Sequence, residues 1–245
     1  MDNERKTLVL TGASRGIGHA TVKRFNAAGW RVITCSRQPF SEECPWDAGP
    51  EDHVVIDLAD EESTHRGIQT LHERLAHEPL NALVNNAAIS PKLGSSTRLS
   101  TLNTEVDLWR TVFNVNFFAP IVLARGLIDE LSAGNGSIVN VTSIAGGRVH
   151  PFAGSAYATS KAALASLTRE MAADLGPLGI RVNAIAPGEI ETSMIGPEYR
   201  EMAKDIPMRR LGTAEEVAKT IYFLCTEQSS YVNGAEVHIN GGQHV

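Results

Sequence analysis

Short apolar runs recur along the chain and constrain its fold more than any other feature of the sequence. Most are apolar at consecutive positions instead of alternating with polar residues, which is typical of strands covered on both faces. The longer segments between several of them have helical character, and alternating strand and helix units form a parallel sheet with helices on both sides. The sequence therefore predicts an α/β fold with a doubly wound, seven-stranded parallel sheet. The runs lie at 7–10, 31–35, 53–56, 82–85, 137–141, 181–186 and 235–239.

The predicted sheet belongs to a single domain. The chain has 245 residues, of which 42% are hydrophobic, and this is enough to bury one large core. No repeat, low-complexity segment or linker divides the sequence. We therefore expect one domain over residues 1–245.

Composition and charge exclude several classes of protein. The chain has no run of about 18 apolar residues, and its charged start MDNERKT has no hydrophobic region behind it, so we expect neither a membrane span nor a signal peptide. A cytoplasmic protein is expected. The net charge of −6 comes without a long basic cluster, so the electrostatic footprint of a nucleic-acid binder is missing.

The cysteines and histidines favour neither disulfides nor a metal. Cys35, Cys44 and Cys225 are odd in number and have no CxxC spacing, which indicates reduced thiols. The eight histidines form neither HxxxH nor HxH, so no metal site is predicted.

Three glycines follow the first predicted strand in TGASRGIG and precede the amphipathic segment HATVKRFNAAG. Glycine lets a chain turn sharply, lets backbone N–H groups approach a pyrophosphate and lets a helix pack on a strand, while the helix amino terminus favours an anion. This context predicts a Rossmann-type dinucleotide loop, and the alternative is an ordinary glycine turn. The loop residues expected to contact the cofactor are Gly12, Ser14, Arg15, Gly16, Ile17 and Gly18.

The end of the second predicted strand indicates which dinucleotide binds. An acidic residue about 20 residues beyond the loop commonly binds the ribose 2′-hydroxyl of NAD, whereas an arginine suits the 2′-phosphate of NADP. Here Ser36 and Arg37 stand at that position, Arg15 offers a second cation, and no carboxylate adjoins Arg37. We predict NADP(H) as the cofactor. If both arginines are merely solvated, NAD(H) is the alternative.

Tyr157 and Lys161 lie four positions apart in SAYATSKAA, a stretch otherwise made of small residues. On a helix, side chains at this spacing share a face. A free phenol has a pKa of about 10, and a neighbouring ammonium lowers that pKa because it favours the phenolate. The pair would therefore be able to pass protons, and the alternative is an amphipathic surface pair.

The helix that carries this pair is expected to continue to about Leu175, where Gly176 and Pro177 supply a stop. Its residues ALASLTREMAADL are apolar over more of the circumference than one core contact requires. The wide apolar face favours a partner helix from another subunit, hence a homo-oligomer, either dimer or tetramer. Deep burial within the monomer is the alternative.

TGASRGIG, NNAA, NVTS, YATSK and IRVNAIAPG occur in this order, and together they closely resemble the short-chain dehydrogenase/reductase family, in its single-domain 3-oxoacyl-reductase-like branch. The resemblance covers essentially all of the chain. It implies that Tyr157 protonates the carbonyl oxygen as hydride arrives from the nicotinamide, and acts as the base in reverse. Lys161 would bind the nicotinamide ribose and lower the pKa of Tyr157. Ser143 would donate a hydrogen bond to the same substrate oxygen, the alternative being a residue that merely caps a strand end.

Asn116 in FNVNFFAP aligns with the family asparagine whose main-chain carbonyl holds a water next to the lysine, and Asn114 is the competing candidate. Pro120 has no amide hydrogen, so the helical bond from position 120 to position 116 is missing and leaves the Asn116 carbonyl without its helical donor. We expect Pro120 to help form the kink of a proton relay.

The resemblance also implies further cofactor contacts. The carboxamide of the nicotinamide is expected to bond to the Ile190 backbone and to Thr192. The usual NNAG is NNAA here, so Ala88 raises a question about the backbone angle or clearance at that turn. The expected contacts are Asp57 and Leu58 around adenine, Asn85 and Ala87 along the cofactor, and Pro187, Gly188, Ile190 and Thr192 at the nicotinamide end.

Taken together, these features predict an oxidoreductase that moves a hydride between NADP(H) and a carbonyl or secondary alcohol. An NAD-preferring dehydrogenase of the same family, an epimerase or dehydratase of the related longer family, and a non-catalytic NADP-binding regulator are the alternatives. Three variable stretches, at 89–104, 144–154 and 189–210, would set the substrate, and the last is expected to act as a lid.

Charged residues in two of these stretches have open roles. Glu189 and Glu191 would meet a polar or cationic substrate, although solvated carboxylates are favoured. Arg148 and His150 would contact an acidic group, although surface positions are favoured.

Overall fold

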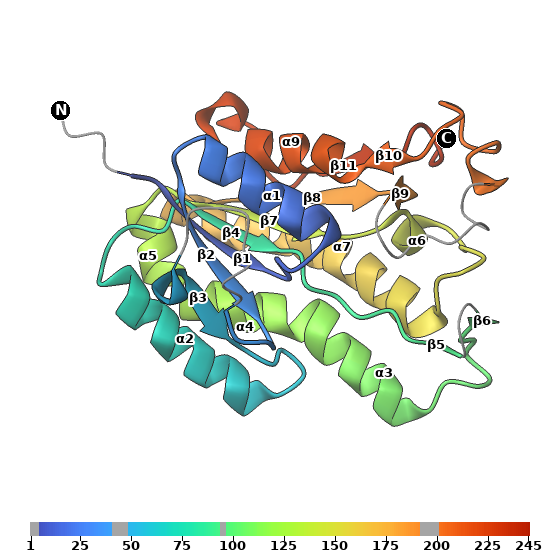
Figure 1. Ribbon diagram of the computed structural model, residues 1–245, viewed down its shortest axis with the longest axis horizontal. Coiled ribbons are helices and arrows are strands. Elements are labelled where there is room, and N and C mark those ends of the chain that lie inside the picture. Colours follow the sequence, from blue (N-terminus) through green and yellow to red (C-terminus); the bar gives the residue numbers. More distant parts are fainter. Residues whose placement is uncertain (1–4, 41–48, 94–96, 192–200) are drawn as a thin grey trace.

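A seven-stranded parallel sheet forms the centre of the molecule in a computed structural model, which describes residues 5–40, 49–93, 97–191 and 201–245. The strand order is β11-β8-β7-β4-β1-β2-β3 (Figure 1). The strands are β1 (Thr7–Thr11), β2 (Arg31–Ser36), β3 (His53–Val55), β4 (Ala82–Asn85), β7 (Ser137–Val141), β8 (Arg181–Pro187) and β11 (Glu236–Ile239).

The seven predicted strands and the doubly wound α/β fold are confirmed, each strand within one residue of its expected bounds. The chain order reverses between β1 and β4, which lie side by side although the strands β2 and β3 separate them in the sequence. In open sheets of this kind, ligands bind at such a switch point, beyond the carboxyl ends of the strands.

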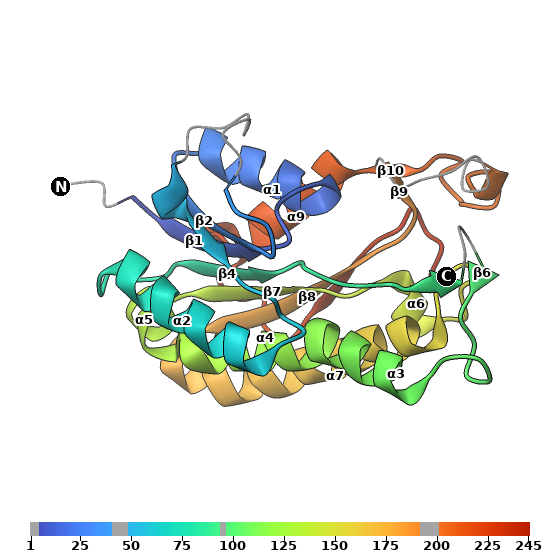
Figure 2. The ribbon, with the colours of Figure 1, turned by 60° about the horizontal axis from the view of Figure 1, so that its bottom comes forward.

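Helices cover both faces of the sheet (Figure 2). The helices α1 (Gly16–Ala27) and α9 (Ala214–Leu224) lie together on one face. The opposite face carries α2 (Glu61–Leu75), α3 (Val106–Phe113), α4 (Ala119–Gly126), α5 (Ile128–Ala133) and α7 (Ser155–Leu175).

Shorter elements connect these layers. They are η1 (Pro50–Asp52), β5 (Lys92–Leu93), β6 (Thr97–Arg98), the π-helical turn η2 (Asn114–Phe118), α6 (Ile144–Gly147), η3 (Gly176–Leu178), β9 (Ile190–Glu191), β10 (Gly212–Thr213) and η4 (Glu227–Ser229).

The strands are buried on both sides because each face of the sheet packs against its own apolar cluster. One cluster, on the side of α2, α4 and α7, includes Val9, Leu71 and Leu123. The other, on the side of α1 and α9, includes Leu8 and Phe25. Two covered faces explain why the strand segments are apolar at consecutive positions.

The long helix α7 begins at Ser155 and ends at Leu175, where the sequence predicts its end. Its fully buried residues repeat every three or four positions and include Ser160, Leu164 and Thr168, while Arg169 is exposed. The helix is therefore packed on one side against the sheet and is not buried all round.

Two of the cysteines, Cys35 and Cys225, are buried thiols whose pKa burial raises to about 12. Cys44 lies outside the described residues. Within the described part of the chain, no helix is both long enough and apolar enough to cross a membrane.

Candidate active site

The carboxyl ends of the strands surround one large cavity of about 1040 Å³. It runs from the loop after β1 to the turn after β8, so it crosses the switch point between β1 and β4. The predicted site residues that line it are Gly12, Ser14, Arg15, Gly16, Ile17, Ser36, Arg37, Asp57, Leu58, Ala87, Ser143, Tyr157, Lys161, Pro187, Gly188 and Ile190.

The glycine loop needs its glycines for stereochemical reasons. Gly12 and Gly16 have φ of +74° and +57°, where an L side chain is strained. A Cβ at Gly18 would lie 2.1 Å from the carbonyl oxygen of Gly12, so only glycine lets the start of α1 come so close to the loop. Gly18 thus shapes the loop from behind the cavity wall.

Asn86 is a residue that sequence reasoning passed over, although it belongs to the NNAA motif. Its side-chain amide donates hydrogen bonds to the carbonyl oxygens of Thr11 and Gly12, at 3.0 and 2.8 Å. The main-chain N–H groups of Asn86 and Ala87 both donate to the Thr11 hydroxyl. The turn after β4 therefore holds the glycine loop in place.

The end of the cavity next to β2 carries exposed positive charge. Arg15 and Arg37 are both exposed, and each lines the cavity. The hydroxyl of Ser36 donates to the Gln38 carbonyl, and the His53 ring lies 2.8 Å from the same carbonyl oxygen. The backbone of the segment that carries Arg37 is thereby held in place, while Arg37 itself is exposed at the cavity.

Asn85 lies behind the cavity wall and is buried. Its side-chain amide donates to Oδ1 of Asn140 at 2.9 Å, whereas its own Oδ1 has no hydrogen-bond partner in the described structure. An unsatisfied buried oxygen is costly, so this atom is a candidate acceptor for a ligand or a water.

Tyr157 and Lys161 occupy adjacent turns of α7, as predicted, and both line the cavity. The Lys161 Nζ lies 5.8 Å from the centroid of the Tyr157 ring and donates to the Val141 carbonyl at 2.6 Å. Lys161 is only 1% exposed, and this burial lowers its pKa to about 7. An ammonium in this position favours the phenolate of Tyr157.

Ser143 follows β7 and caps the amino end of the short helix α6. Its hydroxyl oxygen accepts a hydrogen bond from the Ala145 N–H at 3.2 Å, which leaves the hydroxyl proton available to another acceptor. The side chain is half-buried and lines the same cavity as Tyr157. Ser143 therefore caps a helix and faces the cavity as well.

Asn116 is fully buried in η2, just before Pro120. Its side chain is bonded to both main-chain groups of Ile89 and to the Ser160 hydroxyl. The competing Asn114 carbonyl accepts from the Ala119 N–H, five residues further on, whereas the α-helical donor of the Asn116 carbonyl, four residues further on, would be Pro120, which has no N–H. The turn is π-helical and not regular α-helix, and the role of the Asn116 carbonyl stays a prediction.

His150 and Glu189 form a buried hydrogen-bonded pair that the sequence did not reveal. The His150 Nε2 lies 2.5 Å from the Glu189 Oε1, and the two side chains are 10% and 7% exposed. The favoured interpretation of both as solvated surface residues is therefore wrong. Arg148 and Glu191 are exposed, as favoured.

Ala88 does not distort the turn after β4. Among the described residues, it is absent from the positions with positive φ, and its side chain is exposed at the cavity. The question raised by NNAA is thereby answered. Thr192, together with the rest of 192–200 in the expected lid, lies outside the described residues.

The chain is similar to known proteins over nearly its whole length. Residues 12–244 match the protein family described as Enoyl-(Acyl carrier protein) reductase. The chain is 62% identical over 244 residues to Protein FixR of Bradyrhizobium diazoefficiens, with 99% of this chain and 88% of that protein covered. It is 33% identical to the 3-oxoacyl-(acyl-carrier-protein) reductase FabG of Aquifex aeolicus, with 97% and 96% covered.

A solved structure is also similar to this chain over nearly its whole length. It is the crystal structure of an oxidoreductase of the short chain dehydrogenase/reductase family from Brucella ovis, in complex with a partially ordered NAD. The sequence identity is 64% and the TM-score is 0.85, with 97% of this chain and 100% of that chain covered.

Proposed function

This chain belongs to the short-chain dehydrogenase/reductase family, and on that premise we propose that it is an NADP(H)-dependent oxidoreductase for a carbonyl or secondary alcohol substrate. The observation that carries the proposal is the cavity that brings Ser143, Tyr157 and Lys161 next to a glycine-built nucleotide loop. A non-catalytic NADP-binding regulator would have no need of this set.

The cavity fits a pyridine dinucleotide. Two glycines in left-handed conformation and the close approach of Gly18 to Gly12 leave a cradle that a Cβ would fill, at the amino end of α1. Such a cradle exposes backbone N–H groups to a pyrophosphate. We propose that Asp57 and Leu58 bind the adenine, that Asn85 and Ala87 line the middle, and that Pro187, Gly188, Ile190 and Thr192 bind the nicotinamide end.

The two exposed arginines support NADP(H) over NAD(H). Arg37 follows β2 where a 2′-phosphate would lie, and Arg15 offers a second guanidinium. The Brucella ovis relative was solved with a partially ordered NAD, so NAD-dependence is the specific alternative. The neutral Ser36 at the end of β2 provides no carboxylate for a ribose 2′-hydroxyl, and this weighs against that alternative.

The proton is handled by residues of α7 and of the segment after β7. The bound nicotinamide would supply or accept the hydride. We propose that Tyr157 gives its proton to the carbonyl oxygen while the Ser143 hydroxyl donates a hydrogen bond to that oxygen. The Lys161 ammonium favours the phenolate that results. The Asn116 carbonyl would hold the water through which the proton of Tyr157 is replaced.

We also propose that the protein is a cytoplasmic homo-oligomer. A second hollow, of about 370 Å³, lies between α4 and α7 and is lined mostly by apolar side chains, among them Ile121, Ile128 and Leu167. Helices of another subunit would cover it. Light scattering of Ile121→Glu tests this: we expect a smaller particle than the unmodified protein, and an unchanged mass would contradict the proposed contact.

The substitution Tyr157→Phe tests the proposed chemistry, because it removes one hydroxyl and little else. NADPH oxidation would be measured with a panel of ketones, 3-oxoacyl thioesters, sugars and steroids. On the best substrate, we expect turnover to fall by about 100- to 10,000-fold with unchanged affinity for NADPH.

Tyr231→Phe is the matched control, since Tyr231 is fully exposed. It should behave as the unmodified protein. Unchanged turnover in Tyr157→Phe would remove the proposed acid. A wild-type protein that binds NADPH and reduces no member of the panel would favour the regulator.

A further inference from the structure

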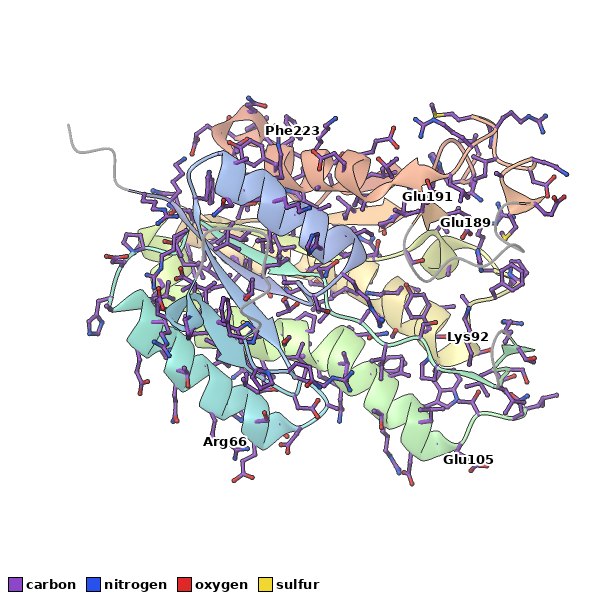
Figure 3. All side chains as sticks on the ribbon, viewed as in Figure 1. Arg66, Lys92, Glu105, Glu189, Glu191 and Phe223 are labelled. Atoms are coloured by element: carbon purple, nitrogen blue, oxygen red, sulfur yellow. The ribbon has the colours of Figure 1, made fainter. Side chains whose placement is uncertain are left out.

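The pair His150 and Glu189 joins the two segments that flank the substrate end of the cavity. His150 belongs to the segment between α6 and α7, which precedes Tyr157, and Glu189 follows the last residues of β8. Both residues line the cavity. In Figure 3, Glu189 and Lys92 lie at the same end of the molecule. Any substrate held at Tyr157 therefore shares its cavity with this pair.

Hydrogen bonding determines which atoms of the pair carry protons. The main-chain N–H of Phe152 donates to the His150 Nδ1 at 3.2 Å, so that nitrogen presents a lone pair. The proton of the ring is then on Nε2, which faces the Glu189 Oε1. The imidazole is neutral in this arrangement, and the Glu189 carboxylate keeps its full negative charge.

The buried carboxylate is not neutralised by another side chain. Among the described residues, His150 is the only basic residue within ion-pair distance of Glu189. Arg148 is nearby in sequence but donates to the Gln243 carbonyl at 2.7 Å. A carboxylate that is 93% buried loses most of its hydration, and such a charge is stable only with strong donors around it.

The backbone holds Glu189 in this position from two sides. Its carbonyl accepts from the Gly212 N–H at 2.9 Å, and the N–H of Gly188 donates to the Ile239 carbonyl at 3.0 Å. The N–H of Glu189 itself faces Oε1 of Gln243 at 3.4 Å. The carboxylate is thus preorganised in the cavity wall before any substrate binds.

We propose that the Glu189 carboxylate, oriented by His150, binds an ammonium group of the substrate, so that the preferred substrates are amino ketones or amino alcohols. This inference rests on the proposed function. A substrate ammonium would supply the positive charge that the buried carboxylate lacks and would form a charge-assisted hydrogen bond with it. His150 is a positioning residue, because it holds the carboxylate and carries no net charge.

A matched series of methyl ketones, CH3–CO–CH2–X, tests the proposal. X is an ammonium in aminoacetone, a hydroxyl in hydroxyacetone, a methyl in 2-butanone and a carboxylate in acetoacetate. Binding to the wild-type complex with NADP+ would be measured by calorimetry at low salt. Because oxidised cofactor has no hydride to transfer, the experiment reports affinity without turnover.

We expect aminoacetone to bind about tenfold more tightly than 2-butanone, and acetoacetate to bind most weakly. In Glu189→Gln, which keeps the shape but not the charge, aminoacetone and 2-butanone should bind within about twofold of each other. Glu191→Gln is the matched control, because Glu191 is exposed two residues further on, and it should leave the ranking unchanged.

Three outcomes would overturn the proposal. The first is equal affinity of the wild type for aminoacetone and 2-butanone. The second is an equal loss of affinity for all four ketones in Glu189→Gln, which is expected if Glu189 only supports the structure of the site. The third is tightest binding of acetoacetate, which would assign recognition to Lys92 on the same cavity. If Glu189→Gln does not fold, the order of ketone affinities in the wild-type protein decides the test by itself. Lack of turnover with NADPH would instead remove the proposed function and leave the ranking intact.

Discussion

The two ends of the cavity carry their charges in opposite settings. At the adenine end, Arg15 and Arg37 are exposed and project from a loop and a strand end that the backbone fixes. At the other end, next to Tyr157, Lys161 and Glu189 are 1% and 7% exposed and are fixed by their own hydrogen bonds. Solvated charges attract a ligand at little cost to the stability of the fold. Buried charges lower that stability, but they bind a ligand with greater specificity.

This comparison predicts that changes at buried charges affect both stability and activity, and that changes at exposed charges affect selectivity alone. Lys161→Met is the strongest test. We expect turnover to fall by about 100- to 1,000-fold, because the charge that favours the phenolate is lost.

The same variant should have a higher free energy of unfolding than the unmodified protein, and this increase should depend on pH. Burial lowers the pKa of Lys161 to about 7 from its ordinary value of 10.5. Below pH 7 the folded protein carries the buried charge at full cost, and this cost declines as pH rises from 7 to 10.5, where the unfolded chain binds more protons than the folded one. In urea unfolding of the cofactor-free proteins, the free energy of unfolding of Lys161→Met should therefore exceed that of the unmodified protein by the largest amount at pH 6. Lys219→Met, at an exposed position of α9, is the control, and a gain that is constant with pH would contradict the burial effect.

The second test concerns the backbone of the adenine end. A side chain at Gly18 must push against the carbonyl of Gly12, which lies 2.1 Å from the position of its Cβ. Gly18→Ala should cost about 1–3 kcal/mol of stability and weaken NADPH binding by about 10- to 100-fold. Fluorescence titration measures the affinity. Gly147→Ala is the control, since its Cβ would enter open space, and equal effects in the two variants would refute the close-contact explanation.

The third test uses an exposed charge at that end. Arg37→Ser removes the cation next to the expected 2′-phosphate but touches nothing buried. We expect the ratio of kcat/KM for NADPH over NADH to fall by about tenfold, with an unchanged melting temperature. A wild-type enzyme with equal kcat/KM for both cofactors would defeat the prediction of NADP(H) preference at once.

The smallest effect is expected where neither charge nor strain is involved. Ala88 has ordinary backbone geometry and lies exposed at the cavity. Ala88→Gly, which restores the usual motif, should change kcat/KM by less than about twofold. A larger change in NADPH oxidation would mean that the methyl group contacts cofactor or substrate.

The features that sequence reasoning found are those with local causes. Buried strands show as apolar runs, the loop shows through glycines that adopt positive φ, and the spacing of Tyr157 and Lys161 follows from helical geometry. Ser143, which follows β7, was found by family resemblance and lies on the same cavity.

The features that it missed depend on contacts between distant segments. His150 and Glu189 are 39 residues apart, and each taken alone is a polar residue in a variable loop. Their burial follows from how the segment after α6 meets the turn after β8, which no local pattern encodes. Asn86 was passed over for a similar reason, because its partners in the glycine loop lie about 75 residues earlier.

The turn that carries Glu189 is held by Ile239 and Gln243, whereas the glycine loop is held by Cys35 and Asn86. Translation proceeds from the amino end, so a growing chain acquires every support of the nucleotide loop before the last strand leaves the ribosome. The backbone contacts of the glycine loop can thus form before those of the Glu189 turn during synthesis. A tag fused after Val245 would lie within two residues of Gln243, which contacts the Glu189 turn.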